Sequence, residues 1–223
     1  MILDTHMHTM EYSPDSFLPI AEAVARAREM GIGGLCVTDH DTLGAAEVIG
    51  RWRREFGFPL FLGVEVLTTE GDFVAFGLDR APRPREITAQ ELIRRLGRLG
   101  GAAVAAHPFR DNGRGARELI GSLPGLAGVE CFNGSTPPAE NLRALGLARK
   151  RGAAALGAGD AHYRERVGLF ATRFYDDLRD EADLISALRL GRCEPMAWDG
   201  RRFVDAEAWC ESQLLKQAQG AAG

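Results

Sequence analysis

Cysteine is scarce in this sequence, and no long apolar run is present. Four cysteines occur: Cys36, Cys131, Cys193 and Cys210. They are far apart and form no C-x-x-C pair, which favours reduced thiols over a disulfide framework. The apolar start of the chain stops at Asp4. We therefore expect no secretory signal, no membrane span and a cytoplasmic location.

A strong net charge is also absent. The 223 residues carry a formal net charge of -4, and 45% of them are hydrophobic and 26% charged. This balance argues against a stable nucleic-acid complex or a membrane surface as the main partner. No repeat, linker or low-complexity segment divides the chain. We expect one domain over residues 1–223, with a disordered tail at 217–223.

Motifs for covalent or nucleotide-dependent chemistry are missing as well. The sequence has no Gly-rich phosphate loop of the P-loop or dinucleotide type and no serine nucleophile elbow. A covalent enzyme intermediate is therefore not indicated.

What the sequence does contain is a regular alternation of apolar strands and amphipathic helices. Strands are expected at the chain start and at 34–42, 59–68, 72–78, 102–106, 127–133, 153–162 and 169–175, and helices at about 16–31, 43–56, 88–100, 139–151, 181–191 and 204–217. Continuous apolar strands that each precede a helix are typical of a parallel sheet covered by helices. Polar residues end nearly every strand. A closed or nearly closed β/α barrel of about seven units explains this better than an open sheet.

All five histidines lie at the ends of expected strands: His6, His8, His40, His107 and His162. Acidic residues accompany them, with Asp39 and Asp41 beside His40, Asp160 before His162, and Glu65 at its own strand end. In an extended "DTHMHT", the side chains of residues 4, 6 and 8 share one face. Nitrogen and oxygen ligands together suit Zn²⁺, Mn²⁺ or Fe²⁺. The pattern predicts a multinuclear metal centre at one rim of the barrel.

Five segments carry a family resemblance. "DTHMHT", "VTDHDT", "GVEV", "AAHPF" and "GAGDAH" resemble, in this order, the motifs of the PHP (polymerase and histidinol phosphatase) superfamily of metal-dependent phosphoesterases. Residues 168–195 also look like the closing part of small stand-alone members. The resemblance implies a distorted seven-stranded, TIM-like β/α barrel with two or three divalent metals, Zn, Mn or Fe, at the carboxyl ends of its strands. It further implies hydrolysis of a phosphate monoester or diester, of a small molecule or nucleotide, by a hydroxide that bridges metals.

The resemblance also assigns ligands. A first metal would be held by His6, His8, Glu65 and Asp160, and Glu65 would bridge to a second metal that also takes His107. A third metal would be held by His40 and His162. Catalytic roles would fall to Glu65, Asp160, His162 and Arg110.

Two positions depart from the fullest family pattern. Many members supply a histidine from the hairpin arm after the bridging glutamate, but this chain offers only Asp72, which could equally be a turn residue beside Gly71. The loop after His8 is one residue longer than usual. Asp15 is its expected ligand with Glu11 as a rival, and Asp15 otherwise reads as a loop acid ahead of a helix cap at Ser16.

Metals alone would leave part of the negative charge of a substrate phosphate facing solvent. A planar guanidinium can donate hydrogen bonds to two phosphate oxygens at once. Arg110, three residues after His107 in "HPFR", is the candidate, and Arg164 in "DAHYRER" is the alternative. A third possibility is that both are solvated loop arginines. Glu130 is expected to point into the rim behind the ligands.

Two other functions compete. Amidohydrolases also open with two histidines one residue apart, but many bridge their metals with a carboxylated lysine. The only lysines here, Lys150 and Lys216, fall in expected helices, and Glu65 takes the bridging place. The second competitor is a metal-binding barrel without turnover.

Overall fold

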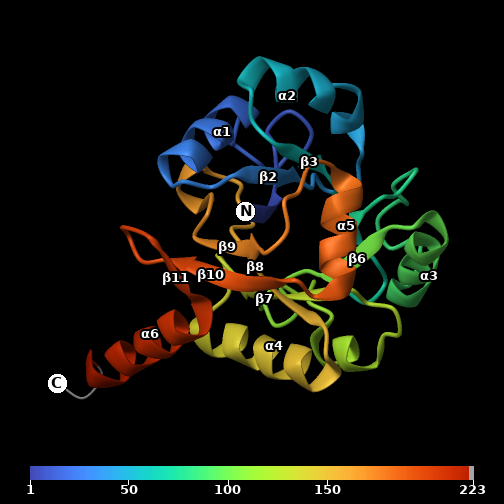
Figure 1. Cartoon of the computed structure of the whole chain (residues 1–223). Helices are drawn as coiled ribbons and strands as arrows, with labels where there is room; N and C mark the ends of the chain where they lie inside the picture. Colours follow the sequence, from blue (N-terminus) through green and yellow to red (C-terminus); the bar gives the residue numbers. More distant parts are fainter. Residues whose placement is uncertain (221–223) are drawn as a thin grey trace.

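The computed structural model describes residues 1–220 and has an α/β fold, in which helices cover the outside of two sheets (Figure 1). The elements in chain order are β1 (Ile2–Met7), α1 (Ile20–Glu29), β2 (Gly34–Val37), η1 (Gly44–Glu47), α2 (Ile49–Phe56), β3 (Leu60–Leu62), β4 (Val64–Leu67), β5 (Asp72–Phe76), α3 (Ala89–Leu99), β6 (Ala102–Ala105), η2 (Arg117–Ser122), β7 (Gly128–Asn133), α4 (Pro138–Arg151), β8 (Ala154–Ala158), η3 (Arg164–Arg166), β9 (Phe170–Phe174), α5 (Glu181–Leu190), β10 (Cys193–Trp198), β11 (Phe203–Asp205) and α6 (Ala206–Gly220). The expected alternation of strands and helices is confirmed.

The strands form two mixed sheets. One has six strands in the order β11-β10-β9-β1-β2-β3, and the other has five in the order β4-β5-β6-β7-β8. Strands β1, β2 and β3 are parallel, as are β6, β7 and β8, whereas β5, β9, β10 and β11 pair antiparallel with their neighbours. The expected closed seven-stranded barrel is not confirmed for the described residues. The antiparallel β9–β11 arm widens the first sheet, and no continuous ladder joins the two sheets.

Gly63 marks the point where the chain passes between sheets. The segment "PLFLGVEVLT" was expected to be one strand, but it divides into β3 and β4, which belong to different sheets. A Cβ at Gly63 would lie 2.8 Å from Phe76 Cε1 and 3.0 Å from Thr38 Cγ2. A larger residue would therefore force apart the elements that meet here.

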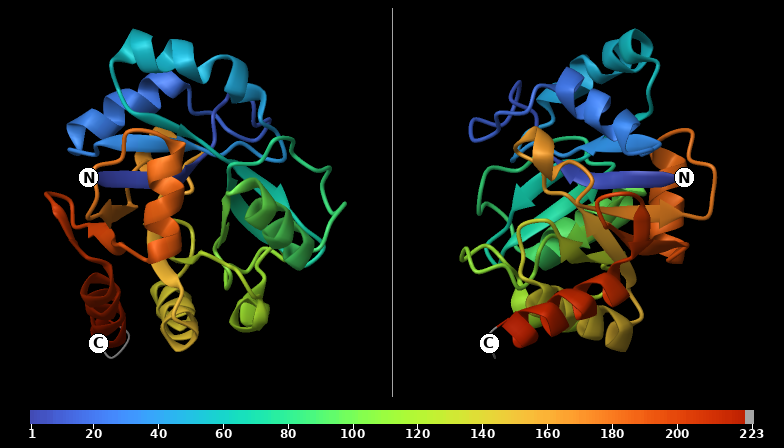
Figure 2. Two further views of the ribbon diagram at one scale, coloured as in Figure 1. Left: turned by 45° about the vertical axis from the view of Figure 1, so that its right-hand side comes forward. Right: turned by 90° about the vertical axis from the view of Figure 1, so that its left-hand side faces the viewer.

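The interior between the sheets is filled by side chains from both. Leu3 and Phe61 from one sheet pack with Val104 and Leu156 from the other, and Leu184 of α5 lies against them. Helix α5 covers the end of the interior where β1 begins (Figure 2). The opposite end, where β1 terminates at Met7, is the end that carries the histidines.

Several local expectations are corrected. Ser16 does not cap α1, which begins at Ile20 after Pro19; its Oγ instead donates to the carbonyl oxygen of His8 at 2.8 Å. The capping box of Thr88 and Glu91 at α3 is present as expected. Residues 217–220, expected in a disordered tail, belong to α6, while 221–223 lie outside the described residues.

Within residues 1–220, no helix combines the length and hydropathy that a bilayer crossing requires. All four cysteines are free thiols, as expected.

At the histidine-bearing end, two isolated bridges join the sheets. Met7 pairs with Ala161, and His40 pairs with Glu65. Met7 stands between His6 and His8, and Ala161 stands between Asp160 and His162. The main-chain N–H of His8 donates to Ala161 O at 2.9 Å, and that of Asp41 donates to Glu65 O at 2.8 Å. The bridges therefore hold the ends of four separate strands at fixed positions relative to one another.

Candidate metal centre

A small polar cleft opens where these strand ends meet. Its volume is about 200 Å³. It is lined by ten residues: Asp15, His40, Glu65, Asp72, His107, Arg110, Asn112, Arg114, Asp160 and His162. His6 and His8 lie directly beneath it and are buried. The structure thus gathers residues from every motif that the sequence singled out.

The first group of potential ligands consists of His6, His8 and Asp160. The Nε2 atoms of the two histidines are 3.0 Å apart. Asp160 Oδ1 lies 3.4 Å from His8 Nε2 and 3.8 Å from His6 Nε2. Two imidazole lone pairs that face each other at this distance repel unless a proton or a cation lies between them.

Glu65 reaches both the first group and a second one. Its Oε2 lies 3.4 Å from both His6 Nε2 and His8 Nε2 and 2.8 Å from His40 Nδ1. Its Oε1 lies 3.0 Å from His107 Nε2. Oε2 is buried yet accepts no hydrogen bond of acceptable geometry. A buried carboxylate oxygen surrounded by ring nitrogens in this way is suited to a cation.

The second group is Glu65, Asp72 and His107. Asp72 Oδ2 lies 3.8 Å from His107 Nε2. Asp72 is not merely a turn residue, because it is buried at the start of β5 and is held by Arg114, whose Nε donates to Oδ2 at 2.6 Å and whose Nη2 donates to Oδ1 at 3.0 Å. Burial and the charge of Glu65 raise the pKa of Asp72 to about 6, against the opposing effect of Arg114.

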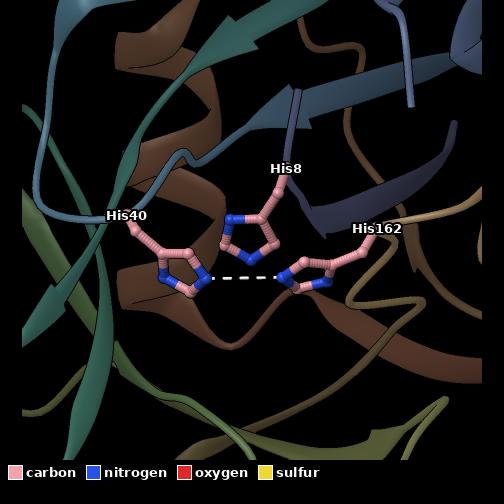
Figure 3. A group of neighbouring side chains, drawn as sticks. All are labelled: His8, His40 and His162. Carbon is pink, nitrogen blue, oxygen red and sulfur yellow. Dashed lines mark hydrogen bonds between the residues drawn. The ribbon is translucent and has the colours of Figure 1, made fainter. Parts of the chain in front are cut away.

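The third group is His8, His40 and His162, whose rings converge in Figure 3. The Nε2 atoms of His40 and His162 are 3.4 Å apart. Asp15 Oδ2 lies 3.2 Å from His40 Nε2 and 3.5 Å from His162 Nε2. The rival residue Glu11 is directed elsewhere, because its Oε1 accepts from the main-chain N–H of Ile20.

A layer of polar residues behind these groups fixes the rings. Ser13 Oγ lies 3.4 Å from His8 Nδ1 and donates to Asp39 Oδ1 at 2.8 Å. Glu130 Oε2 accepts from His6 Nδ1 at 2.8 Å. Both contacts leave Nε2 of each ring free to face the cleft.

Asn133 connects two of the buried acids. Its Nδ2 donates to Asp160 Oδ2 at 3.2 Å and to Glu130 Oε1. Sequence reasoning missed Ser13, Asn133 and Arg114. Asn133 ends the strand "AGVECFN", so its place at a strand end was an available signal.

Asp4 does not join the histidines, contrary to the expectation that residues 4, 6 and 8 share a face. The pairing of β1 with β2 shifts register between Asp4 and Met7. The Asp4 carboxylate accepts main-chain N–H groups of Gly159 at 2.9 Å and Gly168 at 2.8 Å. It therefore anchors the turn that precedes Asp160. Burial raises the pKa of Asp4 to about 7, against these hydrogen bonds.

Three of the five non-glycine residues with positive φ in the described chain lie in the ligand-bearing motifs. Asp41, His107 and Asp160 have positive φ angles of 52°, 28° and 50°. Residues other than glycine adopt this region at a cost, and such residues cluster at functional sites. Asp41 is fixed there because its Oδ1 accepts from the N–H of Leu67 at 2.8 Å.

The two candidate arginines have different surroundings. Arg110 lines the cleft, is 29% exposed, and donates from Nη1 to Asp160 Oδ2 at 2.5 Å. Arg164 does not line the cleft; its Nη2 pairs with Glu29 Oε1 of α1 at 2.5 Å. Of these two candidates, Arg110 is the one that lines the cleft.

Electrostatics within the centre are dominated by buried charge. Burial opposes an imidazolium at His6, but Glu65, Glu130 and Asp160 together hold its pKa well above the usual value. Burial lowers the pKa of His8 to about 3. Burial alone would raise the pKa of Glu65, yet the charge of His6 holds it well below the usual range. These carboxylates thus favour positive charge at His6, the place to which a cation would also be attracted.

The donor set fits divalent metals. Imidazole nitrogens and carboxylate oxygens converge in three groups, and one carboxylate oxygen has no hydrogen bond. Zn²⁺, Mn²⁺ and Fe²⁺ all accept such mixed ligands.

Comparison with known families agrees with this geometry. The family model described as PHP domain matches residues 4–126 of the 223. The chain belongs to the PHP family. A second model, described as PHP-associated, matches residues 138–193. An uncharacterized protein of Methanocaldococcus jannaschii is 31% identical over 143 residues, which are 60% of this chain and 82% of that protein.

Solved structures share the PHP fold at low identity. A two-domain protein of Bacteroides vulgatus containing a predicted PHP-like metal-dependent phosphoesterase has a TM-score of 0.68 at 16% identity, over 89% of this chain and 64% of that one. An amidohydrolase of Chromobacterium violaceum, with bound sulfate and no metal, has a TM-score of 0.58 at 21% identity, over 86% and 96%. A lesion-specific endonuclease of Pyrococcus furiosus has a TM-score of 0.53 at 13% identity, over 91% and 58%. These likenesses establish the fold.

The raised pKa of His6 makes metal affinity depend on pH. Below that pKa, a metal that takes His6 Nε2 must displace one proton, so its apparent dissociation constant should rise about tenfold for each unit by which the pH falls. Zn²⁺ competition titrations against a chelating dye, at several pH values around neutrality, measure this slope. An affinity that does not change with pH would show that His6 is not a ligand.

Proposed function

We propose that this PHP chain is a metal-dependent phosphoesterase that hydrolyses a phosphate monoester or diester, of a small molecule or a nucleotide. The observation that carries the proposal is the buried carboxylate of Glu65. One of its oxygens faces His6 and His8, and the other faces His107. A carboxylate with ring nitrogens on both sides is arranged to hold two cations side by side.

The ligands would be shared as follows. His6, His8, Glu65 and Asp160 would hold the first metal. Glu65, His107 and Asp72 would hold the second. A third metal would be held by His40, His162 and Asp15. Asp15 lies on the open side of the cleft, and its side chain is 56% exposed.

When bound, divalent cations lower the pKa of water between them and offset negative charge on phosphoryl oxygens. The chain supplies the remaining functions. Glu130 and Ser13 fix the ring orientations of His6 and His8. Arg110 faces the cleft beside Asp160, where its guanidinium can meet phosphate oxygens.

Two observations favour this over the amidohydrolase alternative. Lys150 and Lys216 are exposed on α4 and α6, so neither is available as a carboxylated bridge. Glu65 occupies the position between the first two groups instead. The open cleft argues against a metal-binding protein without catalytic activity, because a purely structural metal site is usually closed by protein ligands.

We further propose that residues 1–223 act as one PHP-type domain. PHP and PHP-associated matches cover both of its halves, and no composition break separates them.

A substrate screen tests the activity directly. Protein loaded with Zn²⁺, Mn²⁺ or Fe²⁺ should release phosphate from monoesters or cleave diesters, including nucleotides and oligonucleotides, because an endonuclease shares the fold. Asp160→Asn should reduce the rate at least about a hundredfold. Asparagine tolerates the positive φ at this position, so the fold should be retained. Asp111→Asn, a change at a fully exposed carboxylate, is the control.

Turnover of amides or lactones without any phosphate ester would favour the amidohydrolase reading instead. Metal binding without any turnover would favour the alternative of a metal-binding protein that is not an enzyme.

The role of Arg110 can be tested against Arg164. Arg110→Ala should slow phosphate-ester hydrolysis by about one to three orders of magnitude, at about 1.4 kcal/mol per tenfold, with unchanged metal content. Arg164→Ala should have near-wild-type rates, because Arg164 pairs with Glu29 away from the cleft. Kinetics and elemental analysis on both variants provide the measurement. Equal rates in the two variants would remove Arg110 from substrate binding.

A further inference from the structure

Arg114 binds a carboxylate that a metal would also use. Its guanidinium makes a two-pronged contact with Asp72, from Nε to Oδ2 at 2.6 Å and from Nη2 to Oδ1 at 3.0 Å. Asp72 is 1% exposed and Arg114 is 33% exposed, and both line the cleft. Both oxygens of Asp72 are therefore occupied by a cationic side chain of the same chain.

Arg114 and a metal would compete for the same atom, Asp72 Oδ2. It receives the shorter of the two hydrogen bonds, and it is also the Asp72 oxygen 3.8 Å from His107 Nε2 in the second ligand group. A divalent cation among Glu65, Asp72 and His107 would meet the guanidinium at close range. Two positive charges that share one buried carboxylate repel strongly in a low-dielectric site.

The main chain of Arg114 is held by a hydrogen bond that does not involve its partly exposed side chain. The N–H of Asp72 donates to Arg114 O at 2.8 Å. A Cβ on the adjacent Gly71 would lie 2.7 Å from that same oxygen, so the two segments are in close contact. A guanidinium released from Asp72 would consequently remain in the cleft.

We propose that a divalent cation at the Glu65–Asp72–His107 position binds in exchange for the Arg114 guanidinium, and that the released guanidinium then binds a phosphate oxyanion in the cleft. Occupancy of the second position and phosphate binding are thereby linked. The inference rests on the proposed metal dependence, but it concerns Arg114, which no family resemblance assigned.

Metal titration of the metal-free protein provides the first test. In Arg114→Gln, calorimetry with Zn²⁺ should show the second binding phase tightened about tenfold, because its competitor is removed, and the first phase unchanged. Arg117→Gln is the matched control: it removes the first arginine of η2, which is 50% exposed and whose acidic neighbour is the exposed Asp111. It should bind Zn²⁺ like the wild type. A second phase that is unchanged or weakened in Arg114→Gln would overturn the proposal.

The wild-type protein provides the second test, which does not depend on any variant binding metal. The side-chain ¹H–¹⁵N signal of Arg114 Nε, assigned as the one absent from Arg114→Lys, should be protected in the metal-free protein. It should shift and exchange faster at the second equivalent of Zn²⁺, and shift again on addition of inorganic phosphate. A signal that stays unchanged through metal saturation would contradict the exchange.

The two hypotheses can fail separately. If the exchange occurs but no phosphate ester is hydrolysed, the proposed function fails and the inference about Arg114 stands. If phosphate esters are hydrolysed while the Arg114 signal and the second phase do not respond, the inference fails alone.

Discussion

The arrangement of this centre depends on the burial of negative charge around Glu65. Four buried carboxylates, those of Glu65, Asp72, Glu130 and Asp160, lie within hydrogen-bonding or near-contact distance of the same cluster of imidazoles. Within residues 1–220, only two arginines, Arg110 and Arg114, pair with them. Uncompensated buried carboxylates are costly, so the cluster attracts any available cation. Without metal, the two guanidinium groups offset part of this negative charge, and the carboxylates around His6 raise its pKa.

The fold holds this charge in place through a few specific contacts. Two single-residue bridges join the sheets at the ligand-bearing strand ends, and Asp4 clamps the turn before Asp160 through two main-chain N–H groups. His107 and Asp160, which line the cleft, both have positive φ angles. The α5 end of the molecule supplies packing and contributes no ligand. Stability and chemistry are thus largely separated at opposite ends of the strands.

Much of the centre could be predicted because strand ends are visible in a sequence. The five histidines, Glu65 and Asp160 each follow an apolar run, and parallel strands bring such ends to one edge. Other features depend on contacts between distant segments. The register shift that removes Asp4 from the histidine face, the division of one apolar run at Gly63, and the pairing of Arg164 with Glu29 have no local signature. Arg114 was missed for the same reason, since its partner lies 42 residues earlier.

The central claim is that Glu65 holds two metals together, and electron paramagnetic resonance of the Mn²⁺-loaded protein tests it most directly. Two Mn²⁺ ions joined by one carboxylate, about 3.5–4 Å apart, should give a spin-coupled signal at two equivalents of bound metal. Glu65→Gln should convert this signal into that of isolated Mn²⁺. A wild-type protein that binds two equivalents and shows only isolated Mn²⁺ would contradict the account.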